Sequence, residues 1–315
     1  MQTSRIDIHR ERPTPRETYT GLSGQLTLKM KTLTYIHIGS GREGLIIPLN
    51  LEQIIKGKSF EKAVLELAGR TATGFVENSS TSGKPVVPAS TMKGRTRTRI
   101  ELTIPMRKDG KHWSCFIKAS LPQNAYSKAA WRHRRLYGDA VLENRGPSCD
   151  LTRENTVCLT CDMFGTAGLQ GLVSFSDFTA EQDTTNNIAG EFGIKIQAIR
   201  PGTELFGSVY FRNLSKPRLG LLLYGLGICG NPSGHTILVG RLKYRGMLGG
   251  KSFGKAVLNL VEARFSKILE DIDGVTPGKP VAGSELYRLC NLLWNAAVET
   301  YNVQVFEEAE KLGSA

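Results

Sequence analysis

The chain has 315 residues, of which 40% are hydrophobic and 22% are charged, proportions that suit a globular protein with a sizeable core. Its apolar runs are short and broken by glycine, which excludes a membrane span, and its arginine-rich start lacks the apolar segment of a secretory signal, so we expect a cytoplasmic protein. Most of the net charge of +12 lies between Lys84 and Arg145, where 14 Lys and Arg stand against 4 Asp and Glu. Such concentration is typical of proteins that neutralise nucleic-acid phosphates, although a solvated basic face gives the same count.

The first half of the chain predicts a strand, an insertion and two helices. Residues 21–38 alternate apolar and polar side chains, as a half-buried strand does. Apolar spacing over 58–68 predicts a short helix inside an insertion. A second helix is expected from Ser90 or Thr91, either of which can cap it, to about Leu102. Further on we expect a strand at 113–121 and a basic helix at 125–138, which contains Arg132 and Arg134.

The second half alternates further strands and helices. We expect strands at 169–178, 194–212, 238–244 and 255–265, and helices at 214–228 and 284–311. The polar, turn-rich residues 179–193 are typical of a projecting hairpin. An element order near β-α-β-β-α-β favours an α+β fold of the ferredoxin-like (RRM-like) type with large insertions, although that fold alone does not establish a function.

A glycine-rich stretch, GMLGGKSFG, occupies residues 246–254. Its Gly-Lys-Ser tripeptide is also found in nucleotide-binding phosphate loops, but those need a glycine five residues before Gly250, where this chain has Arg245, and a helix afterwards, where this chain predicts a strand. We therefore reject nucleotide hydrolysis. A strand–loop–strand element remains, whose bare amides at Gly249 and Gly250 can approach a polynucleotide backbone, or which is an ordinary flexible hairpin.

The stretch PVVPASTMKGR at residues 85–95 continues into an alternation of arginine and threonine. Because residues i and i+2 of a helix lie about 200° apart, Arg95 and Arg97 cannot share one face. Ser90 and Lys93, near the helix start, are better placed to contact phosphate. The alternative is a solvated helix with internal charge pairs.

Three of the six cysteines, Cys149, Cys158 and Cys161, lie within thirteen residues of one another, a clustering that indicates a metal site. Zinc takes four ligands in a tetrahedron, and a closed set of four would be structural. Spacing leaves the fourth ligand open among His112, Cys115, His133 and Asp150. The alternative is a set of free thiols.

Two further stretches complete a pattern with the proline-bounded and glycine-rich segments. They are CLTCDMFG at 158–165 followed by GLVSFSDF at 171–178, and IRPGTELF at 199–206. The four segments, in this order, resemble the RAMP superfamily of CRISPR-associated proteins. The group that they resemble most is the backbone subunit of type III effector complexes.

This resemblance implies a right-hand-shaped protein of one domain over 1–315. It would comprise a palm (20–42, 85–125 and 165–265), an insertion (43–84), a zinc-bearing basic insertion (126–164), a thumb hairpin (179–193) and a C-terminal helix (284–311). Copies or paralogues would stack along a CRISPR RNA with other effector subunits and would position target RNA. The expected RNA-binding residues are Ser90, Lys93, Arg95, Arg97, Arg132, Arg134, Gly249, Gly250, Lys251 and Ser252.

The resemblance also bears on zinc and on cleavage. Some family members hold zinc with one His and three Cys, which favours His133 beside Cys149, Cys158 and Cys161. Cleaving subunits use an aspartate after the first strand, whereas here none occurs between Asp7 and Asp109. We therefore expect a non-cleaving subunit.

Two alternative functions remain open at this point. The first is an endoribonuclease of the same superfamily that cleaves target RNA or processes the guide precursor, with Glu77 or His37 as weak catalytic candidates. The second is a generic RNA-recognition module, whose aromatic platform is not visible in the sequence.

Overall fold

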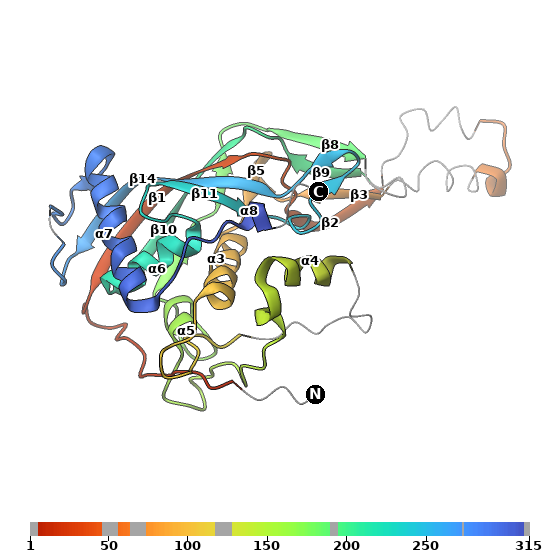
Figure 1. The fold of residues 1–315 in the computed structure, drawn as a ribbon. Coiled ribbons are helices and arrows are strands. Elements are labelled where there is room, and N and C mark those ends of the chain that lie inside the picture. Colours follow the sequence, from red (N-terminus) through yellow and green to blue (C-terminus); the bar gives the residue numbers. More distant parts are fainter. Residues whose placement is uncertain are drawn as a thin grey trace.

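The computed structural model describes residues 6–45, 56–63, 74–116, 128–189, 195–272 and 274–311. It has a large sheet with helices on one side, a smaller four-stranded sheet that extends away from it, and a two-stranded hairpin (Figure 1). Among the described helices, none combines the length and the apolar character that a membrane crossing requires.

The large sheet is built around strand β1 (Leu22–Thr32), whose buried Leu26, Leu28 and Met30 alternate with exposed or half-exposed polar residues. Its antiparallel neighbours are β10 (Glu204–Leu214) on one side and β14 (Lys255–Lys267) on the other. The order across the sheet continues with β11 (Ser233–Leu238) beyond β14, and with β7 (Phe178–Ala180), β5 (Lys84–Val87) and β4 (Ser80–Thr81) beyond β10. The short strands β6 (Val173–Phe175) and β15 (Pro280–Val281) pair with β10 and β14.

Helices α3 (Ala89–Thr103), α6 (Lys216–Leu226) and α7 (Gly283–Tyr301) lie on the same side of this sheet (Figure 1). Helix α6 begins at Ser215, whose hydroxyl accepts the amide of Arg218, and ends at a left-handed Gly227. A Cβ at Gly220 would lie 1.9 Å from the carbonyl oxygen of Leu293, so only glycine lets α6 approach α7 this closely. The core therefore lies between the inner sheet face and these helices.

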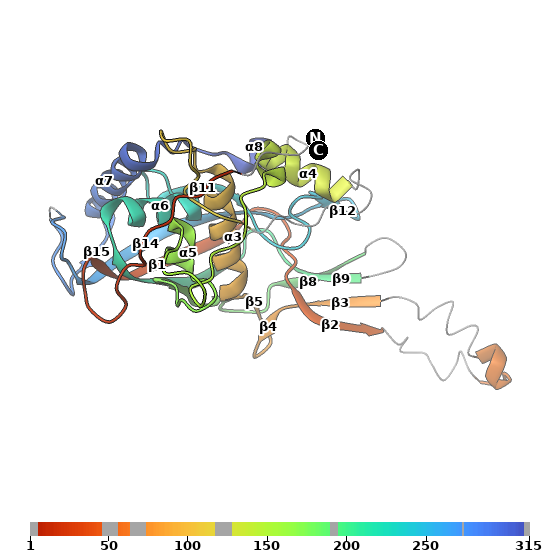
Figure 2. The same cartoon turned by 90° about the horizontal axis from the view of Figure 1, so that it is seen from below.

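The smaller sheet has the order β2-β3-β9-β8 and projects from the body of the protein (Figure 2). Its strands are β2 (Gly39–Leu45), β3 (Gly74–Asn78), β8 (Thr185–Ala189) and β9 (Lys195–Ile199). Strands β8 and β9 pair antiparallel as a hairpin, while β3 and β9 run parallel. The sheet thus joins segments from both halves of the chain.

The segment between α3 and β6 contains α4 (Lys128–Tyr137), the 3-10 turn η1 (Gly138–Leu142) and α5 (Leu159–Phe164). The C-terminal segment returns after α7 and ends in the short helix α8 (Glu308–Lys311). Glu308 is 1% exposed and pairs with two buried arginines of α3, Arg95 at 2.7 Å and Arg99 at 2.6 Å. The C-terminal segment is thereby joined to α3.

The structure also differs from several sequence expectations. Residues 241–245 form turns rather than the end of a strand over 238–244, and residues 113–116 are not a strand. The helix expected over 284–311 is two helices, because Asn302 adopts a left-handed conformation with φ of 52°. Of the helix expected over 58–68, residues 60–63 are helical and 64–68 lie outside the described residues, as do residues 46–55 and 69–73 of the insertion at 43–84.

Candidate nucleic-acid interface and metal site

The glycine-rich stretch forms a tight hairpin of β12 (Met247–Leu248) and β13 (Lys251–Ser252). Its two turn residues, Gly249 and Gly250, have φ angles of 54° and 71°, in the left-handed region that glycine adopts without strain. Lys251 and Ser252 are exposed. The element that follows the hairpin is strand β14 and not the helix that a nucleotide-hydrolase loop requires.

This glycine hairpin (residues 247–252) packs against the β8–β9 hairpin. Leu248 and Phe253 form a small buried cluster with Ile188 of β8 and Ala198 of β9. A Cβ at Gly249 would lie 2.1 Å from the carbonyl oxygen of Ala189, the last residue of β8. Close packing at the turn therefore fixes how the exposed side chains of β13 are presented.

Helix α4 lies next to the chain that enters the glycine hairpin. The ring of His133 is 5.0 Å from the ring of Tyr244, between centroids. Burial, together with the nearby Arg95, lowers the pKa of Lys243 to about 8. Arg134 is exposed on α4 and pairs with Asp139 at 2.6 Å. Arg132 belongs to α4, but its side chain is outside the described residues.

The start of α3 differs from the expectation in the residue that occupies its N-cap position. Pro88 occupies the N-cap position and no side chain caps the helix, so neither Ser90 nor Thr91 is the cap. The first amide, that of Ala89, donates to Asp177 Oδ1 at 2.8 Å. Ser90 is exposed, while Lys93 is half-buried and burial lowers its pKa. Both remain able to meet a phosphate.

The arginines that follow point inward. Arg95 is 6% exposed and donates to Glu308 and to the carbonyl oxygen of Gly225. Arg97 donates to Glu101 at 2.7 Å, to the carbonyl oxygen of Gly165 at 2.8 Å and to Cys161 Sγ at 3.2 Å. These contacts engage the buried guanidinium of Arg95 and the partly exposed guanidinium of Arg97 with acceptors of the protein itself, so an RNA contact by either residue would have to replace them.

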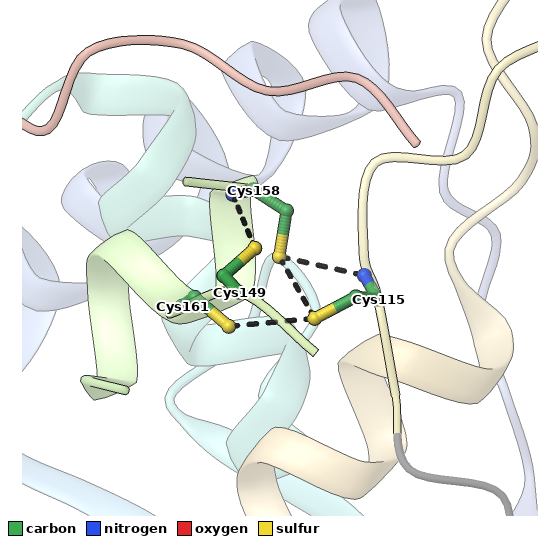
Figure 3. A group of neighbouring side chains, drawn as sticks. All are labelled: Cys115, Cys149, Cys158 and Cys161. Atoms are coloured by element: carbon green, nitrogen blue, oxygen red, sulfur yellow. Dashed lines mark hydrogen bonds between the residues drawn. The ribbon is translucent and has the colours of Figure 1, made fainter. Parts of the chain in front are cut away.

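Four cysteine side chains point toward one another near the start of α5 (Figure 3). The sulfur atoms of Cys115, Cys149, Cys158 and Cys161 all lie within 4.8 Å of one another, and all four residues are buried and free of disulfides. Tetrahedral zinc with Zn–S bonds of about 2.3 Å separates its sulfurs by about 3.8 Å. The group therefore fits a metal ion held by four thiolates with little movement.

Mutual hydrogen bonds among the four thiols lower the pKa of Cys149 and Cys158 and raise the pKa of Cys115 and Cys161, so two of the four sulfurs favour the thiolate form that binds metal. Hydrogen bonds from the neighbouring thiols lower the pKa of Cys149, and Arg10 Nε adds to this by donating to Cys149 Sγ at 3.4 Å. Backbone amides of Cys115 and Cys158 donate to Cys158 Sγ and Cys149 Sγ at 3.4 and 3.2 Å. Donors of this kind commonly surround metal-bound sulfur.

The fourth member of the group is Cys115, and the preferred candidate, His133, is not part of it. His133 packs its ring between Tyr137 and Tyr244, and burial lowers the pKa of its imidazole. His112 faces Glu143 at 3.6 Å, and Asp150 accepts from Thr152. The sequence makes Cys115 one of four possible ligands but contains no signal that selects it.

The two weak catalytic candidates have ordinary structural positions. His37 is 1% exposed and its Nδ1 lies 2.7 Å from the carbonyl oxygen of Gln197, while burial lowers its pKa. Glu77 is a half-buried residue of β3. Neither is brought to the glycine hairpin by a contact that the described residues make.

Comparison with known proteins gives one family match and distant structural likenesses. A family model described as the RAMP superfamily matches residues 29–252. The crystal structure of Thermofilum pendens Csc2 is similar over 93% of this chain and 81% of that one, with 13% identity and a TM-score of 0.36. A chain of a type IV-B CRISPR complex is similar over 80% of this chain and 95% of that one, with 12% identity and a TM-score of 0.39. No curated protein matches the sequence.

Proposed function

The chain belongs to the RAMP superfamily, and from this membership we propose that it is an RNA-binding backbone subunit of a type III CRISPR effector complex. In this role it holds CRISPR RNA, positions target RNA, and stacks with paralogues and other effector subunits in a cytoplasmic filament. It does not itself cleave RNA. The contacts are to the RNA backbone, which suits a subunit that must accept any guide sequence.

The strand order supports the ferredoxin-like palm of this proposal. Taken as β1-α3-β7-β10-α6-β14, the elements form an antiparallel sheet in the order β14-β1-β10-β7, with both helices on one face. This is the arrangement of a β-α-β-β-α-β fold. The other strands and helices are then additions to the palm.

The main observation in support of the proposal is where the glycine hairpin packs. Its exposed Lys251 and Ser252 stand beside the β8–β9 hairpin and near the basic helix α4. The thumb was expected at 179–193, and only β8 of this hairpin falls within that range, because 178–180 form β7 of the large sheet and β9 begins at Lys195. Backbone amides at a left-handed Gly-Gly turn, together with a lysine, form a concave donor set that suits phosphate oxygens. Cationic groups around it would attract a polyanion.

The four cysteines support a structural zinc in place of the site that included His133. Four protein ligands leave no open position for a water molecule or a substrate. The ion would join Cys115, the segment before α5 and α5 itself, with Arg10 and Arg97 as surrounding donors. It would thus fix the N-terminal segment and α3 relative to each other.

The proposal of a non-cleaving subunit is supported by the absence of aspartate between Asp7 and Asp109. His37, the candidate base of the alternative endoribonuclease, is buried and bonded to Gln197, so a substrate proton cannot reach it without rearrangement. Glu77 lies in a strand rather than in a free loop.

The test is binding of fluorescein-labelled repeat-containing guide RNA to the full chain at several salt concentrations. Lys251→Ala should weaken binding and reduce the salt slope by about one ion, because one phosphate contact is lost. Lys108→Ala is the matched control, since Lys108 is an exposed lysine on the turn that follows α3 and should leave binding unchanged. Absence of RNA binding by the wild-type chain would refute the proposal, and guide or target fragments of defined length would establish the endoribonuclease instead.

A further inference from the structure

The face of the large sheet opposite α3, α6 and α7 is not covered by any of the described helices (Figure 1). Side chains of β10 that point to this outer face include Phe206 and Tyr210, which are 41% and 46% exposed. The buried residues of β10, such as Leu205 and Val209, point the other way. Four residues of strand place the two rings about 13 Å apart on one face. Two aromatic rings are thus presented to solvent on a rigid surface.

Polar and basic side chains of the neighbouring strands flank these rings. Lys29 of β1 lies directly opposite Phe206, and Gln25 lies directly opposite Tyr210. On the other side of β1, Arg264 of β14 is opposite Gln25. Directly opposite residues of an antiparallel pair have side chains in mutual reach. Each ring therefore has a hydrogen-bonding or cationic group beside it.

A hollow of about 230 Å³ adjoins Tyr210 at one end of this face, lined also by Arg212 and Ser174. The guanidinium of Arg212 lies 4.9 Å from the centre of the Tyr19 ring, and its buried Nε has no hydrogen-bond partner among the described residues. A buried donor without a partner costs free energy unless a ligand or water satisfies it. The hollow therefore combines an aromatic wall with an unused donor.

Positive charge exceeds negative charge on the outer face. Glu204 and Glu262 are paired with Lys29 and Arg264, at 3.1 and 3.2 Å. The remaining cations are Lys31, Arg212 and Lys267, which form no ion pair with a described residue. The unbalanced charge is complementary to a polyanion, and the exposed rings suit the faces of unpaired bases.

We propose that the outer face of the large sheet, around Phe206, Tyr210 and the hollow beside Arg212, is a second RNA-binding surface that stacks the bases of a single strand. It rests on the proposed RNA-binding role but differs from the glycine hairpin in its chemistry. The hairpin holds phosphates, whereas this face holds bases by stacking and their phosphates by the flanking cations. Stacking accepts any base, so the surface binds without sequence preference.

The test measures binding of fluorescein-labelled oligouridine to the full chain by fluorescence anisotropy. Phe206→Ala and Tyr210→Ala should each weaken binding about fivefold or more, with an unchanged salt slope because no charge is removed. Tyr210→Phe should keep most of the affinity, since the ring rather than the hydroxyl stacks. The matched control is Tyr287→Ala, which removes an exposed tyrosine from α7 and should have no effect. Ultraviolet crosslinking of the wild-type complex should label Tyr210 or Phe206.

The outcomes separate this inference from the proposed function. Wild-type affinity in both alanine variants, alongside weakened binding in Lys251→Ala, overturns the outer-face site and leaves the subunit role intact. A change of oligomeric state in sedimentation without a change in RNA affinity also overturns it, because the face would then contact a second copy of the chain. No binding of any RNA by the wild-type chain overturns both.

Discussion

Replacing Glu308 by alanine should destabilise the protein more than any other single change in the C-terminal segment. The side chain is 1% exposed and its carboxylate accepts three hydrogen bonds: Oε1 accepts from Arg95 at 2.7 Å and from Arg99 at 2.6 Å, and Oε2 accepts from the Leu238 amide at 2.8 Å. Arg99 also donates to the carbonyl oxygen of Phe306. Removal of the one anion leaves two buried guanidinium groups without a counter-charge.

We expect the free energy of unfolding to fall by about 3–5 kcal/mol, the usual cost of breaking a buried ion pair from one side. Urea unfolding at neutral pH measures this loss. Glu310→Ala, which removes an exposed carboxylate from the same short helix, should change stability by about 0.5 kcal/mol or less. Replacing Arg95, Arg99 and Glu308 together by apolar residues should recover much of the loss, because the cost arises from uncompensated charge.

The same interaction has a pH signature. Burial alone would raise the pKa of Glu308, but Arg95 and Arg99 hold it below its ordinary value. The carboxylate therefore stabilises the fold above the ordinary carboxyl pKa, and this contribution is lost as pH falls through the lower folded-state value. The difference between wild type and Glu308→Ala should shrink in acid. A loss below about 1 kcal/mol at neutral pH would refute the buried triad.

Two further predictions concern the metal group and the glycine hairpin. Elemental analysis of the purified chain should find one equivalent of zinc. Cys115→Ser should abolish this zinc, whereas His133→Ala and Cys290→Ser should keep it. If Cys115→Ser kept the zinc and His133→Ala lost it, the ligand set expected from the sequence would be correct. Gly249→Ala should weaken guide RNA binding and lower the free energy of unfolding by more than the roughly 1–2 kcal/mol that a left-handed alanine costs, because its Cβ would meet the Ala189 carbonyl oxygen. Gly250 has a similar φ but no atom of a described residue within 4 Å of its Cβ position, so Gly250→Ala should show the backbone cost alone. Equal effects at the two positions would contradict the packing of the glycine hairpin on β8.

Much of the large sheet could be predicted from sequence, because its strands have one buried and one open face. Leu26, Leu28 and Met30 alternate with polar residues for that reason, and the alternation locates β1 and, further on, β10 and β14. The binding role proposed for this open face cannot be predicted in the same way. Phe206 and Tyr210 occur among ordinary strand residues, and they form a surface because none of the described helices covers that face.

The arginines of α3 show where prediction from spacing ends. Helical periodicity separates Arg97 from Arg95 and Arg99, and in the structure Arg97 does face the cysteines while the other two face Glu308. Periodicity cannot tell an inward face from an outward one for a charged residue. The decisive partner, Glu308, lies 213 residues from Arg95 in the sequence, in a short helix that the sequence pattern does not separate from α7.

The cysteine group likewise shows that sequence spacing identifies only part of a site. Cys158 is the N-cap residue of α5 and Cys161 lies in that helix, so local spacing identifies them. Cys115 lies 43 residues before Cys158, and residues 113–116 around it have no regular structure. Only the fold brings it there. Helix α3, which presents Ser90 and Lys93, is held by polar contacts on two sides in addition to apolar packing. On one side Arg97 donates to Cys161. On the other side Arg95 and Arg99 pair with Glu308. Loss of the Arg97–Cys161 contact or of the Glu308 pairs should therefore weaken the proposed RNA contacts at the start of α3 and leave the conformation of the glycine hairpin unchanged.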